Sequence, residues 1–172
     1  ALIGEVRHIH WVKTRTPSPV DQSDEYNWRT DTKIAPGGYF DDLVSHGLNL
    51  FMYLLGDIVE ASGIATNQQG LYSAYDYISG SWKHENGVTG SGSWNFGSFR
   101  PMDKVEISGS KGEIHFSVLG EAPLQLISDK GNQSVFIDHP KHLHQYHVEN
   151  MRKHLFGEAS HPSMGASGVM TS

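Results

Sequence analysis

Several residue types and patterns are missing from the sequence, and each absence excludes a class of protein. Cysteine is absent, which excludes disulfide bridges, thiolate zinc sites and cysteine nucleophiles. No apolar run approaches the roughly 18 residues that a membrane-spanning helix needs, so no membrane partner is expected. Basic residues are few and unclustered: 13 Lys and Arg face 19 Asp and Glu, which predicts no nucleic-acid partner. A reducing, cytoplasmic location fits these features.

The composition that remains is that of one folded domain. Hydrophobic residues make up 37% and aromatic residues 10% of the 172 residues, which suits one core rather than two. The sequence starts without Met and stops in a stretch rich in Gly and Ser, with no closing element. We therefore expect residues 1–172 to form a single domain that is a piece of a longer chain.

Short strand patterns dominate, and tight turns join them. Glu85-Asn86-Gly87 is a strong hairpin signal, and Gly109–Gly112 and Asp129–Asn132 mark two further hairpins. The predicted strands cover residues 5–15, 58–66, 72–84, 88–96, 105–107, 114–118, 124–128 and 134–137. Because alternating strand–helix units are missing, the pattern favours an α+β fold. This fold is an open-faced, mainly antiparallel β-sheet with helices packed on one face.

Two helices are predicted, over Tyr39–Leu55 and over about His142–Leu155. Gly37 and Gly38 precede the first helix, and Gly56 stands in the position that favours a helix end. On a helical wheel of about 100° per residue, the apolar side chains of the first helix share one face. The opposite face carries a polar stripe of Asp42, His46, Asn49 and Tyr53.

The polar stripe contains a pair that is suited to proton transfer. Asp42 and His46 stand four residues apart, so their side chains can meet on one helix face. Histidine changes its charge near neutral pH, and a neighbouring carboxylate can orient it as a general acid or base. The two glycines before the helix would let the backbone approach a ligand closely. The spacing alone leaves a second interpretation open, since most Asp–His pairs at this spacing are solvent-exposed ion pairs.

The surroundings of this stripe resemble a known family. Three segments carry the likeness: Trp28-Arg29, Pro36–Asn49 with the sequence PGGYFDDLVSHGLN, and Tyr53–Asp57 with the sequence YLLGD. They are similar to the C-terminal domain of the glucose–fructose oxidoreductase/inositol dehydrogenase (Gfo/Idh/MocA) family. Val105–Ile114 resembles the strand–Gly-x-Lys-Gly–strand segment of that family, and Ile3–Val6 resembles the start of the domain. The resemblance spans nearly the whole chain.

The resemblance implies a dihydrodipicolinate-reductase-like fold and an NAD(P)-dependent oxidoreductase that acts on a sugar, a polyol or a related hydroxy compound. In this family a Rossmann domain, which comes first in the chain, binds the NAD or NADP cofactor. The sequence contains no Gly-x-Gly-x-x-Gly motif, so we expect the Rossmann domain to lie outside it. The chain alone is expected to hold no cofactor and to be inactive. It would supply the substrate site and a homo-oligomer contact through its sheet face.

The resemblance also implies roles for individual residues. His46 would be the catalytic acid/base at the reacting hydroxyl, and Asp42 would orient it or bind the substrate. Trp28, Arg29 and Asn49 would contact the substrate. No metal ligand is assigned.

Four neighbouring positions complete the comparison with the family pattern. Gly37 and Gly38 would lie close to the cofactor. Val44 stands where Gly is usual, a change that narrows the pocket or alters close packing. Asn49 stands where Asp is usual, which removes a carboxylate from the substrate site.

Two other functions stay open on the residues alone. A self-standing carbohydrate-binding or dimerisation module could use the same sheet without any chemistry. A metal-dependent hydrolase or lyase could be built on the histidines between His139 and His154, because histidine is a common metal ligand. A polar helix end near the site is the simpler interpretation of that segment.

Aromatic residues in the central hairpin bear on the oligomer contact. Trp82, Trp94 and Phe96 either pack beneath the chain's own helices or cover an open sheet face that a second subunit buries. The residues alone do not decide between these two arrangements. The family resemblance favours the subunit interface.

Overall fold

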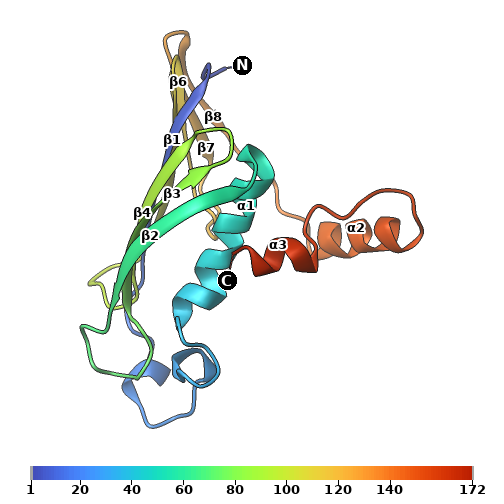
Figure 1. Ribbon diagram of the computed structural model, residues 1–172. Helices are drawn as coiled ribbons and strands as arrows, with labels where there is room; N and C mark the ends of the chain where they lie inside the picture. Colours follow the sequence, from blue (N-terminus) through green and yellow to red (C-terminus); the bar gives the residue numbers. More distant parts are fainter. Residues whose placement is uncertain (1, 172) are drawn as a thin grey trace.

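One broad β-sheet with a helix across one face makes up most of the structure, a computed structural model that describes residues 2–171 (Figure 1). The strands are β1 (Val6–Thr14), β2 (Ile58–Thr66), β3 (Tyr77–His84), β4 (Thr89–Asn95), β5 (Met102–Gly109), β6 (Gly112–Phe116), β7 (Leu124–Ser128) and β8 (Gly131–Val135). The helices are α1 (Ser45–Leu55), α2 (Gln145–Leu155) and α3 (Gly165–Val169). A π-helical turn, Phe40–Val44, runs directly into α1.

The eight strands lie in the order β2-β3-β4-β1-β5-β6-β7-β8. The first strand of the chain is therefore inside the sheet, between β4 and β5. β1 is parallel to β4, and the other neighbouring pairs among the described strands are antiparallel. These findings confirm the predicted α+β fold with an open, mainly antiparallel sheet, and they confirm the three predicted hairpins.

One predicted strand, over residues 72–84, begins only at Tyr77. The residues before it form a loop that closes on Asp76, whose carboxylate is buried. This carboxylate accepts hydrogen bonds from the backbone N–H groups of Gln68 at 2.8 Å and Gln69 at 2.7 Å. The alternation of apolar residues does not reveal a buried carboxylate that accepts hydrogen bonds from a loop. The sequence pattern therefore predicted a strand start five residues before the observed one.

The face of the sheet beneath α1 carries an aromatic core. Phe51 of α1 meets the Trp11 ring edge-to-face at 5.6 Å and stacks on the Trp82 ring at 6.1 Å between centroids. Trp94 and Phe96 belong to the same buried cluster. The expectation that Trp82, Trp94 and Phe96 face a second subunit is therefore wrong. Alternation along a strand separates two faces, but it does not say which face a helix will cover.

Two contacts fix α1 on the sheet. A Cβ atom at Gly47 would lie 2.4 Å from the ring of Trp11, so the missing side chain lets the helix backbone rest on that ring. At the other end, Gly56 leaves the helix with a φ of 87°, in the region that favours glycine. The buried His84 donates from Nδ1 to the Gly56 carbonyl at 2.7 Å and accepts from Trp82 Nε1 at 3.1 Å. These bonds tie the helix end to β3.

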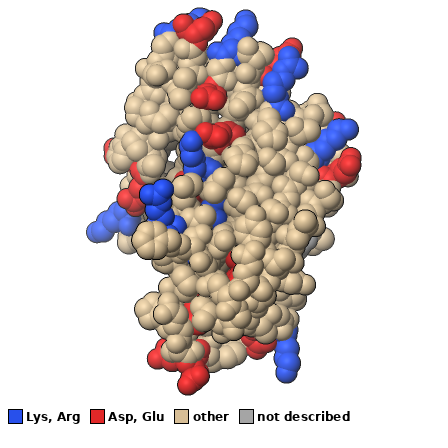
Figure 2. Space-filling view, turned by 90° about the vertical axis from the view of Figure 1, so that its left-hand side faces the viewer, with Lys and Arg blue, Asp and Glu red and all other residues tan. Residues whose placement is uncertain are grey.

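The opposite face of the sheet is polar. Rings of His8 and His10 each come within 3.0 Å of the Ser91 hydroxyl, and Lys104 meets Glu106 at 2.6 Å on the same face. Figure 2, which views the molecule from this side, shows scattered charged side chains around a broad uncharged area. Homo-oligomer formation through this face stays a prediction.

After β8 the chain leaves the sheet and forms an arm, residues 139–163, that contains α2 (Figure 1). α2 begins at Gln145 rather than near the predicted His142. Beyond the arm, the short helix α3 brings the chain back against α1. None of the helices between residues 2 and 171 combines the length and the apolarity that crossing a bilayer requires.

Candidate functional site

The π-helical turn at residues 40–44 opens the candidate site. A π-turn winds more widely than an α-helix, so it rotates the side chains before it relative to those that follow. The predicted stripe therefore crosses a change of helical geometry between Asp42 and His46. Among residues 2–171, no hydrogen bond or ion pair joins these two side chains, and the Asp42 carboxylate pairs elsewhere.

The partner of Asp42 is Arg29, which comes from the loop before the helix. Arg29 Nε donates to Asp42 Oδ2 at 2.6 Å, a short charge-assisted bond between two partly exposed side chains. The Arg29 guanidinium also lies over the Trp28 ring, 4.3 Å from its centroid. Asn27 holds this turn in place, because its side-chain oxygen accepts from the Arg29 backbone N–H at 3.2 Å. The structure thus brings three of the predicted site residues together.

A second carboxylate, Asp21, supports the loop from beneath. Asp21 is 6% exposed and accepts hydrogen bonds from the Tyr39 hydroxyl at 2.5 Å and from the Ser18 backbone N–H at 2.8 Å. The Arg15 guanidinium lies 4.3 Å from the centre of the Tyr39 ring. Burial by itself would raise the pKa of Asp21, but the hydrogen bonds from Tyr39 and Ser18 and the charge of Arg15 together lower it.

Sequence reasoning missed this support. An Asn two residues before Arg29 is a recognisable turn signal, since an Asn side chain often accepts from the backbone N–H two positions on. Asp21 also had a local signal, because Ser18 and Asp21 form a Ser-x-x-Asp pattern in which each backbone N–H donates to the other side chain. Its bond from the Tyr39 hydroxyl had none, because Tyr39 lies 18 residues away.

These side chains surround a surface cavity of about 550 Å³. The cavity is lined by Arg15, Ser18, Val20, Tyr26, Asn27, Trp28, Arg29, Tyr39, Asp42 and Leu43. Among these residues, two arginines face two carboxylates: Asp42, in the lining, and Asp21, just beneath it. Positive and negative side chains are therefore balanced at the cavity. The cavity also has an aromatic surface, because the Trp28 side chain in its lining is 42% exposed.

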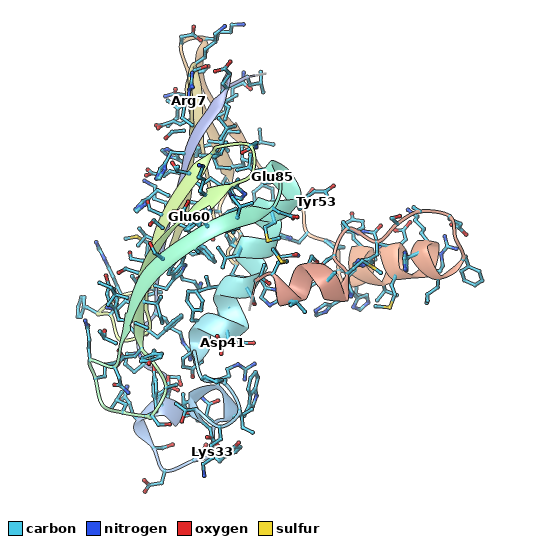
Figure 3. The ribbon with its side chains drawn as sticks, in the orientation of Figure 1. Arg7, Lys33, Asp41, Tyr53, Glu60 and Glu85 are labelled. Atoms are coloured by element: carbon cyan, nitrogen blue, oxygen red, sulfur yellow. The ribbon has the colours of Figure 1, made fainter. Side chains whose placement is uncertain are left out.

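His46 lies at the start of α1, next to this cavity along the chain, and its side chain is exposed. Figure 3 shows Asp41 and Tyr53, which mark the two ends of this helical segment, on the side away from the sheet. Within residues 2–171, His46 makes no hydrogen bond or ion pair, which leaves both ring nitrogens accessible. Its role as acid/base stays a prediction.

Asn49 is held by the segment that follows the arm. Its Nδ2 donates to the Ser163 hydroxyl at 3.0 Å. A substrate contact from Asn49 stays a prediction, and such a contact would use the amide oxygen or displace Ser163.

Gly37 and Gly38 have structural roles within the chain. A Cβ atom at Gly38, whose φ is 64°, would come within 2.9 Å of the Ala74 Cβ. Gly37 donates its backbone N–H to Asp41 Oδ2 at 2.8 Å. Proximity of these glycines to a cofactor stays a prediction.

A dinucleotide needs a parallel strand–turn–helix–strand unit whose glycine-rich turn holds the phosphates. In the described part of the chain, the one parallel strand pair is β1 with β4, and neither strand leads through a glycine-rich turn into a helix. Residues 2–171 therefore do not fit an entire NAD(P) molecule by themselves.

One side chain of the histidine-rich segment, His147, forms a ring pair with a histidine that lies beyond the segment. His147 and His161 meet edge-to-face at 5.0 Å between centroids. Across residues 2–171, no group of three or more His, Asp or Glu side chains is arranged to hold a metal ion. The hydrolase or lyase interpretation consequently finds no support in the geometry.

The fold and the site together define a sheet domain that places one helix and a charged loop beside an open cavity. The sequence profile of the GFO/IDH/MocA C-terminal domain matches residues 2–115. The chain belongs to this oxidoreductase family, as the resemblance in the helix region predicted.

Comparisons with individual proteins agree with this assignment. A curated oxidoreductase of Formosa agariphila is 29% identical over 165 residues, which cover 94% of this chain and 50% of the relative. Levoglucosan dehydrogenase in complex with NADH and levoglucosan has a TM-score of 0.81 at 17% identity, over 99% of this chain and 55% of that one. UDP-N-acetylglucosamine 3-dehydrogenase of Acidithiobacillus ferrooxidans has a TM-score of 0.73 at 14% identity, over 98% and 50% of the two chains. The chain spans about half the length of the relatives it matches.

Proposed function

We propose that this chain is the substrate-binding and catalytic half of an NAD(P)-dependent oxidoreductase that acts on a sugar, a polyol or a related hydroxy compound. Family membership and the names of its relatives support an oxidoreductase. The observation that carries the proposal is the cluster of Trp28, Arg29 and Asp42 at a cavity close in sequence to His46, which lies in the first turn of α1.

The chemistry of this cluster suits a neutral, hydroxyl-rich substrate. Two arginines and two carboxylates balance one another around the cavity, so no net charge favours an ionic ligand. Arg29 and Asp42 offer donors and an acceptor for hydroxyl groups. The exposed ring of Trp28 offers a flat apolar surface for the C–H face of a sugar ring.

In this proposal His46 accepts the proton of the reacting hydroxyl while the substrate carbon loses a hydride. A nicotinamide, bound by a domain outside residues 1–172, supplies the hydride acceptor. Asp42 is already held by Arg29, so we assign it to a substrate hydroxyl rather than to the orientation of His46. Asn49 and Trp28 complete the substrate contacts.

Three further predictions belong to the same proposal. The cofactor is NAD or NADP, the protein forms a homo-oligomer (a dimer or tetramer) through its sheet face, and it acts in the cytoplasm. The chain alone is expected to be inactive, because residues 2–171 lack a dinucleotide-binding unit.

The decisive experiment replaces His46 in the full-length protein. His46→Ala is expected to lower kcat/KM by about 10²- to 10⁴-fold, the usual contribution of a general acid/base, with the unfolding midpoint unchanged. His144→Ala, another exposed histidine, is the matched control and should leave the rate unchanged. The measurement is steady-state reduction of NAD or NADP with a panel of sugars and polyols.

A full rate in His46→Ala would contradict the proposal. Sugar binding without any redox activity in the unmodified protein would support the non-catalytic carbohydrate-binding module instead. Loss of activity on treatment with a chelator would support the metal-dependent alternative.

A further inference from the structure

The cavity beside the candidate site does not include the proposed acid/base. Among residues 2–171, the side chains that line the cavity include Arg29 and Asp42 but not His46. Asp42 precedes His46 by about one helical turn, roughly 5 Å along the helix axis. Figure 3 shows Lys33, which belongs to the loop that supplies most of the lining, beyond Asp41 at the N-terminal end of the helical segment. A sugar ring that places its hydroxyl at His46 therefore lies at the edge of the cavity and does not fill it.

Two exposed aromatic side chains line the wall of this cavity. Tyr26 is 73% exposed and Trp28 is 42% exposed. Within residues 2–171 the Tyr26 hydroxyl has no hydrogen-bond partner, whereas one face of Trp28 is covered by the Arg29 guanidinium. A single exposed aromatic residue is ordinary on a protein surface, but two of them on one cavity wall are typical of a ligand pocket. The Tyr26 ring is therefore available to a part of the ligand that does not reach His46.

The polar groups around the cavity suit a neutral ring with several hydroxyl groups. Arg15 Nη2 lies 3.8 Å from Asp21 Oδ2, which is too far for a hydrogen bond, so the Arg15 guanidinium keeps donors for a ligand. Arg29 uses its Nε for Asp42. Because each guanidinium has a carboxylate beside it, a phosphate or diphosphate bound here would lie close to two negative charges. Hydroxyl groups can accept from the arginines and donate to the carboxylates without adding a charge.

We infer that the substrate is a neutral glycoside of at least two rings. The ring that reacts lies at His46 and Asp42, and the second ring, joined through the glycosidic bond, enters the cavity against Tyr26 and Trp28. This inference rests on the proposed function, which it narrows from sugars in general to disaccharides and similar glycosides. The oxidised carbon belongs to the first ring. Its hydroxyl loses the proton to His46 and the carbon loses a hydride to the nicotinamide, while the glycosidic bond stays intact.

Tyr26 is then a specificity-determining residue, because its ring contacts the second sugar ring and not the reacting one. The apolar C–H face of a sugar ring covers an aromatic ring well, and such a contact is worth about a factor of ten in kcat/KM. The preference for a two-ring substrate should therefore depend on this side chain.

The test compares substrates that share one ring and differ in the second. Methyl β-glucoside is paired with cellobiose, methyl α-glucoside with maltose, methyl β-galactoside with lactose and methyl β-xyloside with xylobiose. In the full-length protein, reduction of NAD or NADP should show a kcat/KM at least about tenfold higher for the disaccharide of the pair that is turned over. Tyr26→Ala should lower the ratio of the two kcat/KM values about tenfold, to near one. The exposure of Tyr26 predicts an unchanged unfolding midpoint.

Tyr75→Ala is the matched control, because Tyr75 is an exposed tyrosine that does not line the cavity. It should leave the ratio of the two kcat/KM values unchanged. Equal kcat/KM values within each pair, or a ratio that survives Tyr26→Ala, would overturn the inference and leave the proposed function standing. A higher kcat/KM for UDP-glucose than for every disaccharide would also overturn it, in favour of a nucleotide-linked sugar.

A binding measurement separates this inference from the proposed function. Saturation-transfer NMR of the same disaccharides with the full-length protein, without NAD or NADP, reports contact with the second ring directly. Binding that is lost in Tyr26→Ala, without any reduction of NAD or NADP, would contradict the proposed function and support the cavity as the site of the second ring. Neither binding nor turnover of any disaccharide would overturn the inference.

Discussion

The two ends of the helical segment from Phe40 to Leu55 are built in different ways. At the C-terminal end, Phe51 is fully buried between two tryptophans, and His84 closes the helix through the Gly56 carbonyl. At the N-terminal end, His46 is exposed in the first turn after a π-turn, and Asp42 is held by a single partly exposed arginine. One end fixes the helix to the sheet, whereas the other leaves polar groups free to meet a ligand.

This difference separates stability from activity along one element. A side chain at the packed end should matter for folding and little for binding. A side chain at the open end should matter for binding and little for folding. The following predictions test the division, in order of decreasing expected effect.

Phe51→Ala should have the largest effect on stability. Removing a fully buried phenylalanine leaves a cavity between Trp11 and Trp82 and costs about 3–5 kcal/mol of unfolding free energy. Urea unfolding followed by tryptophan fluorescence measures the change. Leu54→Ala, at a half-exposed position of the same helix, is the control and should cost far less. A loss below about 1 kcal/mol in Phe51→Ala would mean that the packed end does not anchor the helix.

Asp21→Asn should lower the unfolding free energy at pH 7 by about 1–3 kcal/mol, because the buried carboxylate accepts several hydrogen bonds. The lowered pKa of Asp21 also predicts a pH dependence. Its contribution is fully present above about pH 4, where an unfolded Asp is ionised, and it is lost as the pH falls through the folded pKa.

The variant should therefore show a smaller drop in stability below about pH 4 than the unmodified protein. Urea unfolding at a series of pH values measures both effects. The exposed Asp24→Asn is the control. If the unfolding free energy of Asp21→Asn fell with pH as steeply as that of the unmodified protein, Asp21 would not stabilise the N-terminal end of the helical segment.

Gly47→Ala tests the boundary between the two ends and should have the smallest effect. Alanine gains about 1 kcal/mol of helix propensity, but its Cβ would lie 2.4 Å from the Trp11 ring. That ring is buried and donates a hydrogen bond to Asp103, so it cannot swing aside, and overpacking of this kind costs about 1–3 kcal/mol. We expect a net loss of about 1 kcal/mol in thermal or urea unfolding. A gain in stability would show that the helix can lift from the sheet at this point.

The packed end was largely predictable from the sequence. The apolar face of the helix, its Gly56 end and the Asn86-Gly87 hairpin are local patterns, and local physics decides them. The side of the sheet on which Trp82 and Trp94 lie was not predictable, because it depends on where the helix packs.

The open end was predictable only in part. Helical spacing predicted that Asp42 and His46 belong to one polar stripe. The family resemblance predicted that Trp28 and Arg29 lie near this stripe. The bond between Arg29 and Asp42 was not foreseen, because it joins a loop and a helix 13 residues apart. The π-turn has no reliable sequence signal, and it removes the i to i+4 geometry on which the Asp42–His46 pair was based.

The central place of β1 has a consequence for how the chain folds. This strand precedes the rest of the sheet in the sequence, yet its hydrogen-bonded neighbours on either side, β4 and β5, lie more than 80 residues further along, as the contacts His8–Thr89 and Trp11–Asp103 show. Closing loops of that length is slow, so refolding is expected on the millisecond-to-second scale typical of non-local sheets. Until β4 and β5 have paired with it, the apolar side chains of β1 are exposed to solvent. The yield on dilution from denaturant should consequently fall as the protein concentration rises.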